Sequence, residues 1–435
     1  MNKGQKLYLK AKKIIPGGVQ LLSKRPEIYL PDKWPSYYKS AKGCNIQTLD
    51  GKNLLDFSNC SVGMCPLGYA NKFVNNEVQK NIRNGNICTL NSPYEIELAK
   101  KMISLHPWSS QVKYTKSGGE AVSVAIRIAR AYSKKEKILF CGYHGWHDWY
   151  IAANKNSSNL DQHLLPGVSS NGVPNSLKNT VIPFEYNNES DFNKKFFKNL
   201  KNLACVIMEP TRSVPPNENF IQNIKKFCKK NNIILIFDEI TTGWRECLGG
   251  VHLKYNVSPD FSIFSKGTSN GFPLGIILGN DKLKAAETSF ISSAYWTESM
   301  GFVAALKTIE YMEKNSVQKK LIKKGRLIKK IWKDASEKYK VPIEINGLDA
   351  LANFSFRTKH RNHVMTYFTE QMLKFNILAN GNFFPMISHK KNYIDSYKIA
   401  FEKTMRKIKK NFCNSKPKLN LVKKVKHFKF RNRDN

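Results

Sequence analysis

Hydrophobic and polar residues alternate in blocks between residues 90 and 280, as they do in α/β proteins. Between the apolar blocks lie amphipathic stretches, such as 121–132 and 220–230, which favour helices. Strand–helix alternation predicts a mostly parallel sheet covered by helices, with ligands bound at the carboxyl ends of the strands. Five short apolar segments have the character of buried strands: 137–141, 204–208, 233–237, 261–264 and 275–278.

The two ends of the chain follow a different pattern. The first 85 residues are punctuated by glycine and proline and contain a hairpin-like sequence around Asp50-Gly51. A helix near 301–314 is followed by a lysine-rich helical stretch and a mixed pattern. We therefore predict a large central domain, a small domain assembled from both termini, and a basic, mobile extension without sustained apolar periodicity. Their ranges are 86–300 for the large domain, 1–85 and 301–412 for the small domain, and 413–435 for the extension.

The composition excludes wholesale disorder, because 41% of the 435 residues are hydrophobic and 11% are aromatic. No apolar run approaches the roughly 20 residues that a membrane span needs. Nine cysteines form no CxxC pair, and the N-terminal residues lack the apolar stretch of a signal peptide. We expect a cytoplasmic protein with reduced thiols and no metal site.

The charge balance is strongly basic, since 71 Lys and Arg against 33 Asp and Glu give a net charge of +38. Twelve of these residues are arginine, and nucleic-acid recognition usually relies on arginine. The excess lysines are spread evenly along the chain. This favours a general drift in composition over a surface that evolved to bind polyanions. Residues 403–435 hold thirteen basic residues and one acidic residue, so contact of the basic tail with nucleic acid or another polyanion stays open as an alternative.

Ser117-Gly118-Gly119-Glu120 comes directly before the amphipathic stretch 121–132. Ser-x-x-Glu is a capping box, and paired glycines let an anion approach the positive end of a helix. A plain capped helix and a phosphate site both explain this motif.

Three further residues come at or shortly after the ends of predicted strands: Tyr143, Asp238 and Lys266. Taken singly, a structural ion pair explains Asp238, and chance in a lysine-rich chain explains Lys266. Together with the glycine-bearing cap they form the set that pyridoxal phosphate chemistry requires. That set is a lysine amine, a carboxylate for the pyridinium nitrogen, an aromatic ring to stack on the pyridine, and amides for the phosphate.

Over roughly residues 5–410 the chain resembles the class-III pyridoxal-phosphate aminotransferases. The motifs DEITTGWR and PGGVQLLSKRPE are most similar to the glutamate-1-semialdehyde 2,1-aminomutase branch. The resemblance implies a fold-type-I α/β enzyme, with a mostly parallel central sheet in the large domain and a small α+β domain built from both termini. The segments that carry it are DFSNCSVGMCPLGYAN, SGGEAVSVAIRIARAY, YHGWHD, IMEP, IILIFDEITTGWRECLGG, KYNVSPDFSIFSKG and GFPLG.

The resemblance also implies roles for single residues around the cofactor ring. Lys266 would bind the cofactor covalently and move the proton during catalysis. Asp238 would pair with the pyridine nitrogen, and Ile240 would pack on the ring face opposite Tyr143. Glu209 would lie near the ring oxygen.

At the phosphate, the resemblance implies binding by Ser117, Gly118 and Gly119. Thr297, in AYWTESMG, would reach the phosphate of the neighbouring subunit, which implies a homodimer with shared active sites. For these residues, as for Tyr143, Ile240 and Glu209, packing or capping stays an alternative.

Several positions depart from the family pattern. Gly119 stands where the family usually has serine or threonine, which removes one hydroxyl contact. Asn270 stands where glycine is common, and asparagine tolerates left-handed backbone. The segment YWTESMGF replaces the aminomutase pattern TLSGNP, so the changes affect the isomerase specificity more than the cofactor chemistry.

Because arginine is scarce here, the arginines in motif-bearing segments, Arg25, Arg212 and Arg245, are of interest. We expect Arg25 or Arg212 to meet a substrate carboxylate or other oxyanion, with a structural contact to backbone carbonyls as the alternative.

We predict a homodimeric enzyme that transfers amino groups between small amino and oxo substrates with pyridoxal phosphate. One alternative is a true aminomutase, which shifts the amine within one molecule. The other is a degenerate enzyme that binds polyanions through its basic tail.

Overall fold

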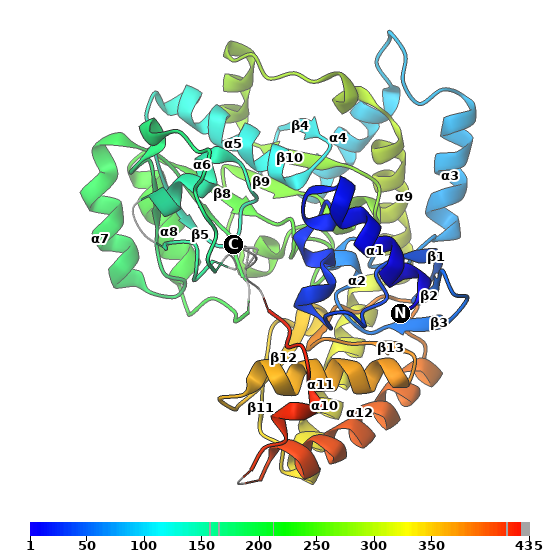
Figure 1. The fold of residues 1–435 in the computed structure, drawn as a ribbon. Helices are drawn as coiled ribbons and strands as arrows, with labels where there is room; N and C mark the ends of the chain where they lie inside the picture. The colour runs from blue at the N-terminus through cyan, green and yellow to red at the C-terminus, as the bar shows by residue number, and fades with distance from the viewer. Residues whose placement is uncertain (156–157, 164–165, 212, 415, 428–435) are drawn as a thin grey trace. The chain divides into compact units, whose positions relative to one another are not determined.

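The computed structural model describes residues 1–155, 158–163, 166–211, 213–414 and 416–427 (Figure 1). These residues form two compact units. Among the described residues, the large unit is Phe73–Asn315, and the small unit joins Met1–Lys72 to residues 316–427. The boundaries expected from the sequence, after residues 85 and 300, differ from these. Within the described part of the chain, no helix is both long and apolar enough to cross a membrane.

A seven-stranded sheet forms the centre of the large unit (Figure 1). Strand β10 is antiparallel to both of its neighbours, and the other pairs are parallel. The mostly parallel sheet is thus confirmed, and each of the five predicted strands is present. The order is β4 (Gln111–Thr115), β10 (Gly275–Gly279), β9 (Phe261–Phe264), β8 (Ile234–Asp238), β7 (Leu203–Met208), β5 (Lys137–Cys141) and β6 (Val181–Pro183).

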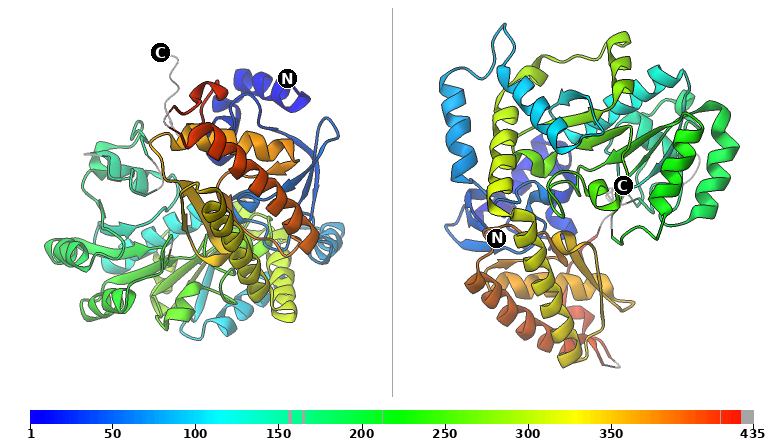
Figure 2. Two further views of the ribbon diagram at one scale, coloured as in Figure 1. Left: turned by 90° about the horizontal axis from the view of Figure 1, so that it is seen from below. Right: turned by 180° about the vertical axis from the view of Figure 1, so that it is seen from behind.

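Helices cover both faces of this sheet, which explains why its central strands are apolar along their whole length (Figure 2). Successive side chains of a strand point to opposite faces. In β7, Cys205 and Ile207 share a core with α5, whereas Val206 and Met208 share one with α7 and α8. The helices of this unit are α3 (Lys72–Arg83), α4 (Pro93–Leu105), α5 (Gly118–Ser133), α6 (Asp148–Ile151), α7 (Glu189–Asn199), α8 (Phe220–Lys230) and α9 (Met300–Asn315).

The small unit contains two sheets and draws on both ends of the chain, as expected. In the first sheet β13 pairs in parallel with β3, so that Leu55 lies opposite Ile377. The predicted hairpin around Asp50-Gly51 connects β2 and β3, and Gly51 has the positive φ of +81° that such a turn requires. The sheets are β1 (Tyr38–Lys42), β2 (Asn45–Thr48), β3 (Asn53–Asp56) and β13 (Ile377–Leu378), and β11 (Ile343–Asn346), β12 (Ala352–Phe356) and β14 (Asn382–Phe383). The helices are α1 (Lys3–Ile14), α2 (Cys60–Gly63), α10 (Val317–Tyr339), α11 (Arg361–Lys374) and α12 (Lys391–Phe412).

Residues 416–427 pack onto the small unit, in contrast to the mobile extension that we predicted. Val422 is buried in a core formed largely by α10, α11 and α12. The backbone N–H of Lys426 donates to Thr366 Oγ1 at 2.9 Å, and that of His427 donates to Glu27 O at 3.0 Å. Val422 is buried, and Leu419 and Val425 are partly buried against the same core, but so few apolar residues produce no sustained periodicity. Residues 428–435 lie outside the described residues.

Candidate active site

Four of the residues singled out in the sequence lie at one edge of the central sheet. Strands β9, β8, β7 and β5 are adjacent and parallel, so their carboxyl ends meet there. Asp238 is the last residue of β8, and Glu209 follows β7 directly. Tyr143 and Lys266 lie shortly beyond the ends of β5 and β9.

Asp238 is a buried carboxylate that is held on both oxygens. Its Oδ2 lies 2.8 Å from His144 Nδ1, and its Oδ1 accepts the backbone N–H of Ile240 at 3.0 Å. The other ring nitrogen, His144 Nε2, lies 3.3 Å from Cys141 O. His144 therefore fixes the orientation of the carboxylate, because a buried charge needs polar partners.

Glu209 supports the turn that carries Tyr143. Its Oε2 accepts the backbone N–H of Tyr143 at 3.1 Å, and its own N–H donates to Cys141 O at 3.1 Å. Gly142 has a φ of +121°, and a Cβ on it would lie 2.6 Å from Glu209 Oε2. The turn therefore requires glycine at this position.

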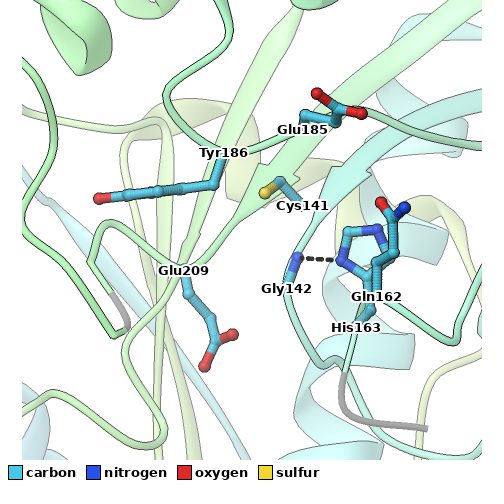
Figure 3. Close-up of a pocket in the computed structure, with 7 residues that line it drawn as sticks. All are labelled: Cys141, Gly142, Gln162, His163, Glu185, Tyr186 and Glu209. Carbon is cyan, nitrogen blue, oxygen red and sulfur yellow. Dashed lines mark hydrogen bonds between the residues drawn. The ribbon is translucent and has the colours of Figure 1, made fainter. Parts of the chain in front are cut away.

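A small cavity lies beside this turn (Figure 3). It measures about 120 Å³, and Glu209, Gly142 and His163 are among its lining residues. The Gly142 N–H donates to His163 Nδ1 at 3.2 Å, and Tyr150 Oη donates to Gly142 O at 2.7 Å. Both polar groups of Gly142 are thus held by side chains, which fixes the peptide that precedes Tyr143.

Lys266 leaves β9 with left-handed backbone, at a φ of +45°. Such a conformation is rare for residues with a Cβ and is found at functional sites more than elsewhere. Its Nζ donates to Thr241 Oγ1 at 2.8 Å. Burial lowers the pKa of Lys266, and the carboxylates of Asp238 and Glu209 oppose that shift. The amine is therefore closer to losing its proton at neutral pH than a lysine in water.

The turn after Lys266 contains Asn270 at a φ of +47°, so asparagine adopts the left-handed backbone expected of it. Arg245, from the motif DEITTGWR, is 1% exposed, and its charge contributes to the lowered pKa of Lys266.

The predicted capping box is present at the start of α5. Ser117 Oγ accepts the N–H of Glu120 at 3.3 Å, and Glu120 Oε2 accepts the N–H of Ser117 at 2.8 Å. A Cβ on Gly118 would lie 2.8 Å from Ile240 Cδ1, so the glycine lets Ile240 approach this helix end. Ile240 in turn directly follows the Asp238-Glu239 pair, which connects the capped helix to the strand-end carboxylate.

The remaining candidates lie in other surroundings. Thr297 is exposed in a short 3-10 turn, where its Oγ1 donates to Ala294 O at 3.0 Å. Arg25 belongs to the small unit and packs against Gly17, on which a Cβ would lie 2.4 Å from Arg25 Nη2. Arg212 lies outside the described residues.

Two residues that contact the candidate site, His144 and Thr241, are not among those predicted from the sequence. Each lies within a quoted motif, YHGWHD for His144 and DEITTGWR for Thr241. Their position within a motif is the signal that could have identified these two residues. Their contacts could not be predicted, because the partner of each residue is distant in the chain.

These residues fit pyridoxal phosphate. A carboxylate held by a histidine suits a cationic ring nitrogen, and the amine of Lys266 lies at the same sheet edge. At the start of α5, the glycine pair lets Ile240 and His147 come close to the helix end, whose backbone amides favour an anion.

Comparison with known proteins gives a consistent picture. The family model for Aminotransferase class-III matches residues 31–401. Glutamate-1-semialdehyde 2,1-aminomutase of Nitrosopumilus maritimus is 33% identical over 366 residues, which cover 81% of this chain and 84% of that protein. The same-named protein of Methanosphaera stadtmanae is 31% identical, with 94% and 100% covered. The 3-aminobutyryl-CoA aminotransferase of Cloacimonas acidaminovorans is 28% identical, with 85% and 88% covered.

Solved structures share the fold. The FumI protein of Sphingopyxis sp. MTA144, in its PLP internal aldimine form, superposes with a TM-score of 0.86 at 20% identity, covering 95% of this chain and 98% of that one. An omega-transaminase from Sphaerobacter thermophilus gives a TM-score of 0.83 at 21% identity, covering 93% and 97%.

Proposed function

The chain belongs to the class-III aminotransferase family, and from this premise we propose that the residues at the carboxyl edge of its central sheet are the active site. The protein is an enzyme of the branch similar to glutamate-1-semialdehyde 2,1-aminomutase, has the fold-type-I architecture and transfers amino groups with pyridoxal phosphate. The observation that carries the assignment of the site is the buried Asp238, oriented by His144, at the same sheet edge as Lys266.

When bound, the cofactor withdraws electrons from the substrate carbon that carries the amine and makes its C–H acidic. Asp238, held by His144 and the N–H of Ile240, favours a proton on the ring nitrogen. Lys266 Nζ takes and returns the substrate proton, and its lowered pKa makes the neutral amine easier to form than that of a lysine in water. Tyr143 and Ile240 enclose the ring.

The other candidate residues complete the site. Glu209 lies on the side of the ring oxygen and holds the turn before Tyr143. Ser117, Gly118 and Gly119 hold the phosphate at the start of α5, where the helix dipole and free amides favour an anion.

The assignment is tested by the absorbance of the purified protein with pyridoxal phosphate. Lys266→Ala removes the band of the covalently held cofactor. Lys113→Ala, which removes a half-buried lysine of β4 in the same sheet, leaves it in place. An unchanged band in Lys266→Ala would contradict the assignment.

We propose intermolecular transfer between two small substrates as the reaction, with the aminomutase reaction as the second candidate because several relatives carry that name. Incubation with glutamate 1-semialdehyde separates the two. An aminomutase converts it without a separate amino donor, whereas a transaminase requires one.

We further propose that Arg25 or Arg212 binds the carboxylate or other oxyanion of the substrate. Replacing each with lysine keeps the charge but loses the planar, bidentate guanidinium, so the KM for the amino donor rises. Unchanged KM values for both variants would remove this part of the proposal.

The proposed assembly is a homodimer with shared sites. Several large apolar side chains are exposed on the large unit, and side chains of this kind are common at protein–protein interfaces. Trp146 (71% exposed) lies beside the start of α5, and Phe290 (86%) and Tyr295 (73%) lie near Thr297 in the sequence.

Two contacts link this surface to the phosphate site. Trp146 Nε1 lies 3.6 Å from the position of a Cβ on Gly119, and Trp296 Nε1 donates to Glu120 Oε1 at 3.5 Å. A second copy that covers these side chains would bring its Thr297 to the phosphate of this subunit.

Mixing two defective variants tests the shared site. Each proposed site takes Lys266 from one chain and Thr297 from the other. In a mixed dimer of Lys266→Ala and Thr297→Ala chains, one site therefore carries both substitutions and the other site carries neither. We expect the mixture to regain the wild-type affinity for pyridoxal phosphate at that intact site. If the mixture binds pyridoxal phosphate no more tightly than Thr297→Ala alone, or if light scattering shows a monomer, the two subunits do not share their sites.

We also propose a cytoplasmic location. All nine cysteines are thiols and not disulfides in the structure, and most of them are buried. This supports a reducing compartment.

A further inference from the structure

Gly119 lacks a side chain at a position where a neighbouring residue fills the space. A Cβ on Gly119 would lie 3.1 Å from His147 Cε1 and 3.3 Å from His147 Nδ1. The loop that carries His147 passes close over the helix start, since a Cβ on Gly145 would lie 3.3 Å from Gly119 Cα. The edge of the imidazole therefore lies where a serine or threonine at 119 would place its side chain.

The nitrogen on that edge is buried and has no hydrogen-bond partner among the described residues. The ring of His147 stacks on Trp146 at a centroid distance of 4.2 Å, which fixes its plane without using Nδ1. The residue precedes α6, but its side chain does not cap that helix, and its backbone oxygen accepts the N–H of Tyr150 instead. A buried polar nitrogen without a partner is unfavourable and indicates a group that is absent from the chain itself.

We propose that His147 Nδ1 donates a hydrogen bond to the phosphate of pyridoxal phosphate, in place of the hydroxyl that Gly119 lacks. This rests on the proposed phosphate site at the start of α5. The capped helix end supplies backbone amides and the positive end of the helix dipole, and the imidazole supplies a side-chain donor next to them.

The charges around the ring agree with a neutral donor. Burial lowers the pKa of His147, while the carboxylates of Glu120 and Asp148 oppose the shift. A neutral imidazole with its proton on Nδ1 is sufficient to donate to a phosphate oxygen.

The test compares two cofactor forms on the apoenzyme, pyridoxal phosphate and pyridoxal, which lacks the phosphate. In His147→Ala the Kd for pyridoxal phosphate rises about tenfold to a hundredfold, as expected for loss of a hydrogen bond to a charged group. The Kd for pyridoxal changes by less than about twofold. Equal weakening of both forms, or no weakening, would overturn the proposal, because a purely structural role of His147 does not distinguish them.

Two further variants sharpen the result. His147→Asn places an amide N–H where Nδ1 lies and retains most of the affinity, whereas His147→Leu does not. In the double variant Gly119→Ser/His147→Ala the introduced hydroxyl occupies the space left by the ring and restores binding of pyridoxal phosphate. Gly119→Ser alone crowds the imidazole and does not tighten binding. Loss of affinity in His147→Asn, together with no rescue by Gly119→Ser in the double variant, would refute the idea.

His363→Ala, on α11 of the small unit, is the matched control and leaves both Kd values unchanged. Circular dichroism confirms that each variant is folded. If the wild-type apoenzyme fails to bind pyridoxal phosphate, the proposed function fails with this inference. If it binds, with a band that depends on Lys266, and His147→Ala binds equally well, only this inference fails.

Discussion

Asp238 is a deeply buried carboxylate, and His144 supplies the polar partner that such a group needs. The carboxylate is 3% exposed, and its Oδ2 lies 2.8 Å from His144 Nδ1. Without a donor at this position, the buried charge would lack a polar partner, which is costly. In the proposed site, the histidine would act on the cofactor through Asp238, as a positioning residue.

We predict that His144→Ala slows the reaction of the bound cofactor with the amino substrate about tenfold to a hundredfold, the effect of removing a hydrogen bond to a buried charge. His144→Asn, which keeps an N–H near the Nδ1 position, recovers part of the rate. Stopped-flow absorbance with saturating cofactor measures it. Equal rates in wild type and His144→Ala would contradict a positioning role.

At the scale of elements, the turn after β5 holds Tyr143 through its glycine. Both the N–H and the C=O of Gly142 are bonded to side chains, and Glu209 lies where its Cβ would be. The chain offers a control that separates backbone strain from steric clash. Gly172 also has a positive φ, of +82°, but a Cβ on it would meet nothing within 4 Å.

Gly142→Ala is therefore expected to lose binding of pyridoxal phosphate, because the clash displaces Glu209 and the Tyr143 backbone. Gly172→Ala costs about 1 kcal/mol of unfolding free energy from strain and leaves binding intact. Fluorescence titration with the cofactor and urea unfolding measure the two effects. Equal binding in both variants would show that the turn tolerates a side chain.

The small unit joins its two chain ends through a buried histidine that must stay neutral. His389 Nδ1 accepts the N–H of Met386 at 2.9 Å, so Nε2 carries the proton and lies 2.7 Å from Asp56 O. Burial lowers the pKa of His389 from 6.5 to about 4. At pH values between these two, His389 is protonated in the unfolded chain and neutral in the folded chain.

The stabilisation from His389 is complete above pH 6.5 and is lost as the pH falls towards 4, by up to about 3 kcal/mol. His389→Gln does not titrate, so its unfolding free energy declines less over this window. Urea unfolding of both proteins at pH 7 and at pH 4.5 tests this. Parallel declines would show that other groups, such as the similarly buried His106, account for the pH dependence.

Sequence reasoning succeeded for elements whose burial leaves a pattern. Strands β7 and β8 are apolar throughout because helices cover both faces, and the cap before α5 carries its own signature. Strands β13 and β14, of two residues each, are too short to leave a pattern. The pairing of His144 with Asp238 joins positions 94 residues apart, and no local rule predicts it.

At the scale of the whole molecule, the burial of an apolar side chain holds the C-terminal segment against the small unit, although the segment carries many charges. The segment is rich in lysine, which favoured a mobile extension, yet Val422 is 7% exposed in the core of the small unit. Burying a valine contributes about 1.5 kcal/mol or more. The adjacent Lys423 and Lys424 stay hydrated at little cost, because their charged ends reach water, whereas Lys426 is buried and its burial lowers its pKa to about 8.

Val422→Ala should lower the unfolding free energy by about 1–2 kcal/mol, through lost burial and the space left behind. The neighbouring Leu421, 43% exposed, supplies the control, and Leu421→Ala changes stability by less than about 0.5 kcal/mol. Denaturant unfolding monitored by tryptophan fluorescence measures both. Similar values for the two variants would mean that the segment is not docked in solution.

The pairing of β3 with β13 has a consequence for the synthesis of the protein. Leu55 leaves the ribosome early, but its partner Ile377 follows only after the whole large unit has been made. During that interval the large unit can fold alone, because its sheet and both cores come from one continuous stretch of chain. The first hairpin must meanwhile wait with an unpaired edge strand, a form that invites pairing with other chains. A nascent chain stalled before residue 377 is therefore the species of this protein most in need of a chaperone.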